Sequence, residues 1–238
     1  MYSFRRIALS LALVTLAVPA LQAQSSSSNP PTQAQPAATT QQLSVQARIR
    51  ARREQRRSNA IHEAYSHRYE AYTGVGYLRF TPGPDRQRTT LYAWDTGLTR
   101  YYNDRLGVTV DGRGYYGTAF VGLNTYGITR PAISQYDALV GPTYRFYLQP
   151  KYSISARVMG GFAHGNFSGD TNGLGGTTLK LYPDANTFAA SASVSAEYSL
   201  TPAVAFRLSP EYFATGFGST TQLSRGFTGS IVYRFGKQ

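Results

Sequence analysis

Few residues of this sequence are of the types that do acid–base or nucleophilic chemistry. There are three histidines and no cysteine, and only His164 lies in the long part of the chain after residue 70. His164 stands in "GFAHGNFSGD", with Asn166 two residues later and Ser168 four residues later. A histidine acts as a base only within hydrogen-bond reach of the group that it activates, and no other histidine can replace this one. The pattern does not favour an enzyme.

A glycine-rich stretch is the second candidate for chemistry. "SGDTNGLGG" at 168–176 places Asp170 and Asn172 among glycines, and both side chains offer the oxygen atoms that calcium prefers. Two such side chains are too few for a calcium site, so we expect an exposed loop. The stretch lacks the lysine and hydroxyl residue of a phosphate-binding loop, and the lack of cysteine excludes the usual zinc clusters. We therefore predict no metal and no cofactor.

Charged residues in the C-terminal part of the chain are the third candidate. They recur at alternate positions and nearly balance in sign, with five arginines and four carboxylates. If they face one another in a space closed to water, they form either a structural network of ion pairs or a narrow path for ions. The nine residues of this predicted network are Asp111, Arg113, Asp137, Arg145, Arg157, Glu197, Arg207, Glu211 and Arg234.

The segments that carry these residues follow a period of two from residue 71 onward. In one of them Tyr152, Ile154 and Val158 alternate with Ser153 and Arg157, which is typical of a half-buried strand. We predict about eight strands of roughly ten residues each. The facing of the first two is left open. The stretches lie near 71–80, 89–102, 106–116, 136–146, 152–162, 188–198, 204–212 and 227–235.

The connections between these strands alternate in length. "YNDR" at 102–105, "QPK" at 149–151 and "LTPA" at 200–203 are short and rich in turn-forming residues. All short turns then lie at one end of the strands and all long loops at the other. This arrangement favours an antiparallel meander that closes into a barrel. The longer links lie near 81–88, 118–134, 163–186 and 214–222.

Alternation alone leaves open whether the apolar face points inward, as in a soluble ligand carrier, or outward, as in a transmembrane barrel. Three features favour the outward direction. The polar face is mostly Ser, Thr, Gly and Ala, whereas a water-facing surface carries many charges. The loops are long at one end only. Aromatic residues gather near both ends of the strands, as they do at two membrane interfaces. The predicted belts contain Tyr101, Tyr102, Phe146, Tyr152, Tyr198 and Tyr233 at the short-turn end, and Phe80, Trp94, Tyr116, Tyr136, Phe162, Phe188, Tyr212 and Phe227 at the loop end.

The first 42 residues form two segments. Residues 1–23 combine two arginines, the apolar run "IALSLALVTLAV" and the small residue Ala23, which are the parts of a secretory signal peptide. The apolar run is shorter than the ~20 residues of a membrane-spanning helix. Residues 24–42 carry no charge and little apolar bulk, so we expect a disordered linker. The chain is predicted to be exported.

Residues 43–70 are rich in helix-forming residues and in arginine. Val45, Ile49, Ile61 and Ala64 keep helical spacing, which predicts a basic amphipathic helix in the periplasm. Two interpretations stay open: a solvated lead-in to the barrel, or a helix that lies on anionic lipid or another polyanion. The arginines of this basic arm are Arg48, Arg50, Arg52, Arg53, Arg56 and Arg57.

The last strand carries the clearest resemblance to known proteins. "RGFTGSIVYRFGKQ" places Phe227, Ile231, Tyr233 and Phe235 on one face and is similar to the C-terminal signal that the insertion machinery of Gram-negative outer membranes recognises. With "YTGVGYLRF" as the opening strand, residues 71–238 resemble the OmpA-type eight-stranded outer-membrane β-barrel family. The resemblance implies an all-β, closed, antiparallel up-and-down transmembrane barrel. It also implies periplasmic termini and extracellular long loops.

The resemblance implies no activity, because a fold does not define a function. We expect a non-enzymatic protein with a structural, anchoring or surface-interaction role. Its expected partners are outer-membrane lipid, the barrel insertion machinery, and peptidoglycan or anionic lipid through the basic arm, with no nucleic acid. Three alternatives stay open: a small-solute channel, a soluble ligand-binding barrel and a lipid A-modifying enzyme. Lipid A deacylases of this size carry a histidine and a serine two residues apart, a motif that His164 and Asn166 do not match.

Overall fold

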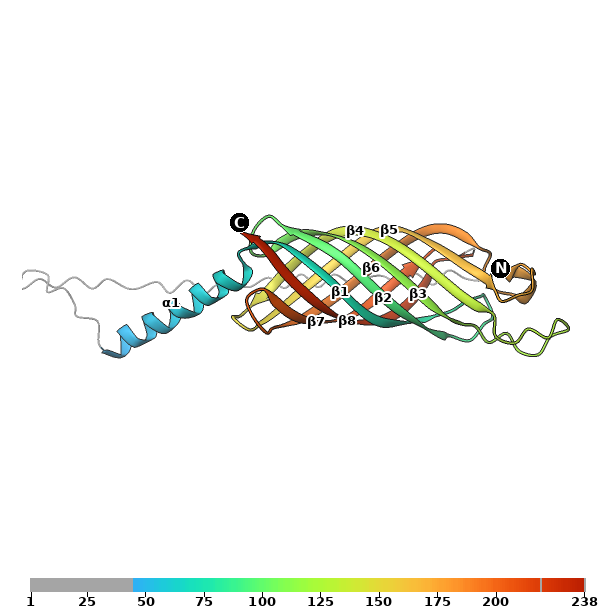
Figure 1. Cartoon of the computed structure of the whole chain (residues 1–238), viewed down its shortest axis with the longest axis horizontal. Helices are drawn as coiled ribbons and strands as arrows, with labels where there is room; N and C mark the ends of the chain where they lie inside the picture. The colour runs from blue at the N-terminus through green and yellow to red at the C-terminus, as the bar shows by residue number, and fades with distance from the viewer. Residues whose placement is uncertain (1–44, 219, 238) are drawn as a thin grey trace, which may run out of the picture. The chain divides into compact units, whose positions relative to one another are not determined.

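A computed structural model describes residues 45–218 and 220–237 of the chain (Figure 1). The predicted signal peptide and linker lie outside the described residues. One α-helix, α1 (Val45–Tyr65), precedes eight strands, and a short 3-10 helix, η1 (Gly176–Leu179), lies in a loop. No helix in these ranges is both long and apolar enough to cross a membrane. The strands are β1 (His67–Phe80), β2 (Thr89–Tyr101), β3 (Leu106–Thr118), β4 (Ala132–Leu148), β5 (Tyr152–Gly169), β6 (Ala185–Ser199), β7 (Val204–Thr215) and β8 (Gln222–Lys237).

The strands form a closed antiparallel barrel in which each strand pairs with the next and β8 pairs with β1. The predicted closed up-and-down barrel of about eight strands is therefore confirmed. The strands are 12 to 18 residues long, which exceeds the roughly ten residues that a tilted strand needs to cross a bilayer. Short turns connect β2 to β3, β4 to β5 and β6 to β7, and longer loops connect the strands at the other end.

The first strand begins earlier than predicted. The helix ends at Tyr65 and β1 starts at His67, whereas the sequence predicts a helical segment up to residue 70 and a barrel from 71. Tyr69 pairs with Arg100 of β2 and with Phe235 of β8. Pairing on both sides of the strand outweighs the helix propensity of a local sequence, because that propensity is worth only a fraction of a kcal/mol per residue.

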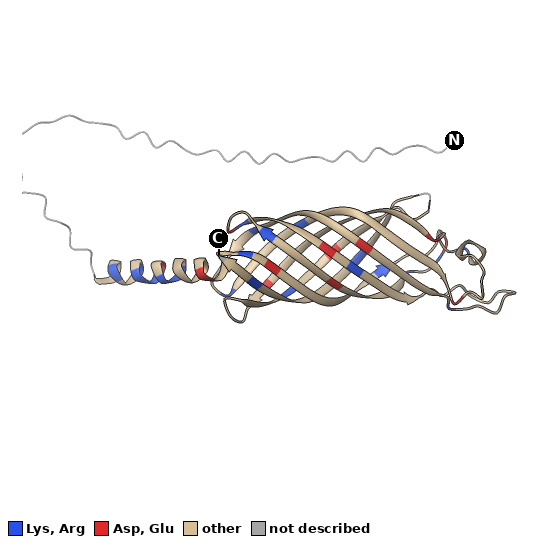
Figure 2. Cartoon of the chain, turned by 45° about the horizontal axis from the view of Figure 1, so that its top comes forward, with Lys and Arg blue, Asp and Glu red and all other residues tan. Residues whose placement is uncertain are grey.

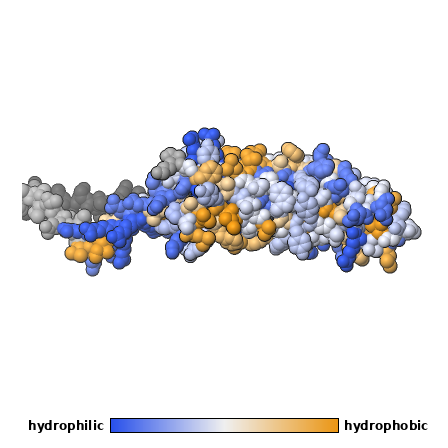
Figure 3. Space-filling view, in the orientation of Figure 1, coloured by the Kyte–Doolittle hydropathy of each residue, from blue (hydrophilic) through white to orange (hydrophobic). Residues whose placement is uncertain are grey.

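The two faces of the barrel wall differ in chemistry. Inward positions carry the buried charged and hydroxyl side chains, and outward positions carry large apolar side chains such as Val110, Val158 and Ile231, each exposed by 59% or more. Figure 3 shows the apolar residues over the barrel wall, with more hydrophilic residues toward its ends. The polar face of the predicted strands is thus the inner face.

Two members of the predicted aromatic belts are on the inner face instead. Phe80 is completely buried, and Tyr101 is exposed by only 1%. Both stand at the end of a strand. A shift of one residue there is enough to move a side chain from the outer face to the inner face. The facing that the sequence leaves open for the first two strands is settled by these residues: Tyr72 and Leu78 of β1 and Leu91 of β2 also point inward.

Apolar side chains pack together in the interior toward the loop end of the barrel. One buried cluster draws on β1 through β7 and on the loops above them. Phe80 stacks on Phe167 with ring centroids 6.0 Å apart, and Phe217 and Tyr182 contact both rings edge-on. Because seven strands contribute to this cluster, it extends across the interior of the barrel.

One arginine joins three of the long loops. Arg86 follows β1, and its guanidinium donates to the carbonyl oxygen of Val121 at 2.8 Å and to that of Leu179 at 2.5 Å. Val121 belongs to the loop between β3 and β4, and Leu179 to the loop between β5 and β6. The backbones of these loops are therefore held to one another as well as to the barrel.

Candidate functional site: ion clusters inside the barrel

All nine residues of the predicted network have side chains inside the barrel wall, and each residue is exposed by 5% or less. Figure 2 shows that charged residues occur along the length of the strands. Glu70 and Asp95 join them on the inner face. The contacts divide these residues into two groups: a cluster around Glu70 and a second cluster around Arg113.

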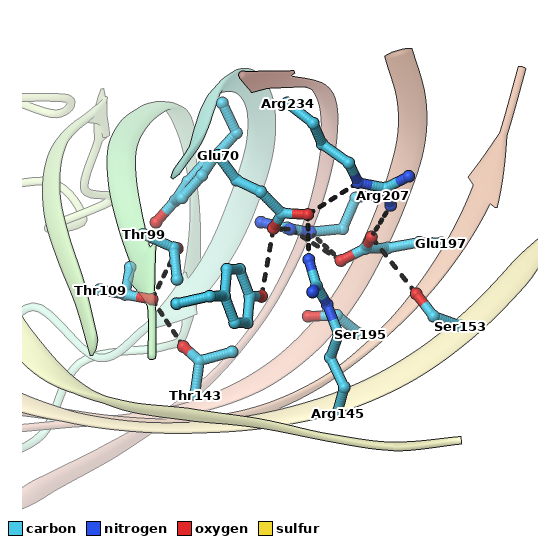
Figure 4. A network of polar contacts seen from close by, with 12 residues as sticks. Glu70, Thr99, Thr109, Thr143, Arg145, Ser153, Ser195, Glu197, Arg207 and Arg234 are labelled. Carbon is cyan, nitrogen blue, oxygen red and sulfur yellow. Dashed lines mark hydrogen bonds and ion pairs between the residues drawn. The ribbon is translucent and has the colours of Figure 1, made fainter. Parts of the chain in front are cut away.

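The Glu70 cluster brings together two carboxylates and three arginines from five strands (Figure 4). Glu70 pairs with Arg145, with Arg207 at 2.9 Å and with Arg234 at 2.8 Å. Glu197 pairs with the same Arg207 and Arg234, each at 2.7 Å. Two shared arginines thus join the carboxylates of β1 and β6, and these ion pairs link strands far apart in the sequence.

Aromatic and hydroxyl side chains surround the Glu70 cluster. The Tyr101 hydroxyl donates to Glu70 Oε2 at 3.1 Å, and the guanidinium of Arg145 lies 3.6 Å from the centre of the same tyrosine ring. Tyr65, the last residue of α1, lies beneath Arg145 and Arg234 at 5.0 and 4.8 Å. The end of the helix is therefore attached to the ion cluster by cation–π contacts, which are worth most where the cation is desolvated.

The second cluster is centred on Arg113. Its guanidinium pairs with Asp111 at 2.5 Å and with Glu211 at 2.6 Å, and Asp111 also accepts a hydrogen bond from the Tyr72 hydroxyl. Arg157 lies 5.2 Å from the centre of the Tyr72 ring. These contacts join β3 to β7 across the interior.

Three charged residues of the interior have no ion pair within the described ranges. Arg157 donates to the hydroxyls of Ser195 and Ser209, each at 3.3 Å. Asp137 accepts from the Gln135 amide at 2.9 Å, and Asp95 accepts from Ser230 at 3.2 Å. The structure therefore brings seven of the nine predicted residues into ion pairs and leaves Asp137 and Arg157 with hydrogen bonds to neutral groups.

Two buried carboxylates and the apolar cluster are absent from the predicted interior. Glu70 falls in the predicted helical segment, although "RYEAYTG" already alternates and places Glu70 in parity with Tyr72. Asp95 stands in a strand whose facing the sequence leaves open. The signal of the apolar cluster is the presence of Leu139, Met159 and Phe213 at the otherwise polar positions of their strands.

The residues of the predicted insertion signal lie on the outer face of β8. Ile231, Tyr233 and Phe235 are exposed by 61%, 55% and 38%, and Phe227 is partly buried against Tyr77. The rings of Tyr233 and Phe235 stack at 5.9 Å. The outer face of β8 is thus aromatic and apolar.

All six arginines of the basic arm are on α1, and each is exposed. At 3.6 residues per turn these arginines cover an arc of about 200° of the helix, and Val45 and Ile49 lie within the same arc. Val45 and Ile49 are exposed as well, by 72% and 45%, and the buried residues of the helix are Ala64 and Tyr65 at its end. The helix therefore lacks the wide apolar face that the prediction of an amphipathic helix requires.

The candidate catalytic residues His164 and Ser168 have separate hydrogen-bond partners. His164 is hydrogen-bonded to Asn186 at 2.7 Å, and the Ser168 hydroxyl donates to Asp184 instead. Asp170 and Asn172 have left-handed backbone conformations in the loop after β5. Within the described ranges, no group of three or more His, Cys, Asp or Glu side chains could hold a metal ion.

Comparisons with known proteins find similarity in structure alone. No protein-family model matches the chain, and no curated protein is similar to it in sequence. Similar solved structures include Ail, the attachment invasion locus protein of Yersinia pestis, with a TM-score of 0.48, 13% identity and coverage of 71% of this chain and 99% of that chain. For Neisserial surface protein A the TM-score is 0.49 and the identity 13%, with coverage of 70% of this chain and 97% of that chain. For the outer membrane protein OprG of Pseudomonas aeruginosa the TM-score is 0.47 and the identity 8%, with coverage of 72% of this chain and 98% of that chain. At these values the comparisons carry no information on what this chain binds or does.

Proposed function

We propose that this chain is a non-enzymatic integral outer-membrane protein whose barrel is a rigid anchor for its loops and its basic arm. One observation carries the proposal: the six carboxylates of the strands are buried inside the barrel, while large apolar side chains cover its outside. In water this arrangement would expose apolar surface and bury charge, both of which are unfavourable. In a bilayer the apolar wall faces lipid and the ion pairs are shielded from it.

The filled interior argues against the two alternatives that need an open lumen. A ligand carrier needs an apolar cavity, whereas this interior is filled by two ion clusters and, toward the loop end, by packed apolar side chains. A channel needs a continuous polar path, and the apolar cluster that includes Leu91, Met159 and Phe213 interrupts it. Steady current across a planar bilayer that contains the purified protein would contradict the proposed anchoring role.

The proposal predicts heat-modifiable migration on gels. Outer-membrane fractions loaded in SDS without boiling should show the protein at one position, and boiled samples at another, because a closed barrel with its ladder of hydrogen bonds resists SDS when cold. Recovery of the protein in the soluble fraction, with identical migration before and after boiling, would overturn the membrane assignment.

We further propose that the basic arm contacts an anionic surface on the periplasmic side. The arginines of α1 are exposed, and Tyr65 fixes the end of the helix to the Glu70 cluster. A juxtamembrane basic residue contributes about 1 kcal/mol of attraction to an anionic surface, and salt screens this attraction. The arginines cover about 200° of the helix with Val45 and Ile49 among them, which suits contact with a polymer or a headgroup layer more than insertion into acyl chains.

The basic arm is tested by replacing all six of its arginines with glutamine in the full chain. Retention on peptidoglycan sacculi, and on vesicles that contain phosphatidylglycerol, should fall for the variant and should fall for the native protein as salt rises. The heat-dependent shift on gels should stay, because the six arginines are exposed on α1 and none of them belongs to the Glu70 cluster or the Arg113 cluster. Equal retention of the variant and the native protein on both surfaces would remove the proposed role of the arm.

A further inference from the structure

Two arginines on the outer face of the barrel lie directly opposite each other near the long loops. Arg79, the residue before the last of β1, pairs in register with Arg225 of β8. Both side chains are exposed. Like charges at opposed positions of an antiparallel strand pair destabilise that pair.

No carboxylate of the barrel wall neutralises this arginine pair, because all six strand carboxylates point inward. Arg79 donates to the hydroxyl of Thr90 on β2 at 3.0 Å, and Arg225 lies 5.6 Å from the centre of the Tyr212 ring on β7. Neither has an ion-pair partner within the described ranges. The two guanidinium groups thus lean toward opposite neighbours, and their positive charge is open to an external anion.

Each arginine also lines an apolar groove in the outer wall. Arg79 lines a groove of about 740 Å³ together with Val75 and Tyr92. Arg225 lines a groove of about 480 Å³ together with Ala192 and Pro210. A cation at the edge of an apolar groove matches a molecule that carries both an anionic group and a hydrocarbon chain.

The next outward-facing pair in the register is aromatic, and its tyrosine lines the Arg79 groove. Tyr77 of β1 lies opposite Phe227 of β8, and their rings stack with centroids 6.4 Å apart. From the loop end along β1 the outer wall therefore presents Arg79, then Tyr77, then Val75, and all three line the Arg79 groove. This order follows the chemistry of a bilayer leaflet, in which phosphate lies outermost, the interface below it, and acyl chains deepest.

We propose that Arg79 and Arg225 bind the phosphate groups of a membrane lipid whose acyl chains lie in the two grooves. The inference rests on the proposed function: with the basic arm and the short turns on the periplasmic side, the long loops lie outside the cell and this end of the barrel lies in the outer leaflet. The phosphorylated lipid of that leaflet is the lipid A part of lipopolysaccharide, and the site is assigned to it. Arginine binds phosphate through charge-assisted hydrogen bonds, and the phosphates supply the negative charge that the outer wall lacks.

The test uses the full-length protein in phosphatidylcholine bilayers titrated with lipid A. The variant Arg79→Gln/Arg225→Gln should bind lipid A about tenfold more weakly or worse than the native protein. Lipid A stripped of its phosphates should bind the native protein as weakly. The variant Arg100→Gln is the matched control, since Arg100 is exposed on the wall at the short-turn end and lies over Tyr102. It should bind lipid A as the native protein does.

Two outcomes overturn this lipid site. Equal affinity of the double variant and the native protein for lipid A would show that the arginine pair does not recognise it. If inorganic phosphate displaces lipid A and binds the protein with the same affinity, the two arginines form a site for free anions. The grooves would then contribute nothing to binding. If either result is obtained while the native protein still shows the heat-dependent shift on gels, only the lipid site is refuted. If the native protein shows no such shift, the proposed outer-membrane assignment itself is refuted.

Discussion

Replacing Glu70 with glutamine should lower the free energy of unfolding by about 3 to 5 kcal/mol, the range for removing one partner of a buried ion pair. Glu70 is the carboxylate that Arg145, Arg207 and Arg234 share. Without its charge, the cluster retains three buried arginines and Glu197 alone. The measurement is urea unfolding of the protein refolded into lipid vesicles, followed by tryptophan fluorescence.

Adding the substitution Arg145→Met to Glu70→Gln shows how much of the loss of stability comes from the charge pair and how much from lost packing. Arg145 has Glu70 as its one ion-pair partner among the described residues, whereas Arg207 and Arg234 also pair with Glu197. The double variant Glu70→Gln/Arg145→Met should therefore be less destabilised than the sum of the two single variants, by about 0.5 to 3 kcal/mol. Glu63→Gln, at an exposed position of α1, should stay within about 0.5 kcal/mol of the native protein. Strict additivity of Glu70→Gln and Arg145→Met would refute the cluster as a coupled unit.

Replacing Val140 with arginine should destabilise the inserted barrel by about 2 to 4 kcal/mol, the cost of an arginine that faces the middle of a bilayer. Val140 lies near the middle of β4, is exposed by 53%, and has Val110 and Gly160 as its neighbours in the register. An arginine at this position has no carboxylate to pair with, because the outer wall carries none. Urea unfolding in vesicles measures the effect.

Leu123→Arg provides the matched control for Val140→Arg. Leu123 is exposed by 97% in the loop between β3 and β4, so an arginine there meets water and should change stability by less than about 0.5 kcal/mol. The two substitutions have the same charge and nearly the same change in side-chain size. If Val140→Arg is as harmless as Leu123→Arg, the outer wall faces water, and the proposal of a transmembrane barrel is wrong.

The period of two in the sequence predicts the strands and their inner faces. Every second residue of a strand faces inward, and many of these inward residues are charged or small. Arg157, Arg207 and Glu211 all lie at the parity that the pattern assigns to the polar face, and all are buried. Strand number and the alternation of short turns with long loops follow from the same local pattern. The closed barrel could therefore be predicted without any distant contact.

The features that were missed depend on contacts between segments far apart in the sequence. Glu70 lies in a locally helical composition, and its place in the barrel follows from the pairing of Tyr69 with β2 and β8. Phe80 belongs inside because Phe167 and Phe217, from β5 and from the loop after β7, pack on it. The periodicity of one strand contains no information on such partners. The ion pairs of Glu70 are of the same kind.

The contacts of Arg86 have a consequence for recognition of the loop end by antibodies. Its guanidinium binds the backbones of two other loops, so the loop end of the barrel presents a composite epitope made of segments separated in the sequence. Antibodies raised against a synthetic peptide from one loop would meet only part of that surface on the native protein. An antiserum against the folded protein would instead recognise a conformation that the substitution Arg86→Ala loosens.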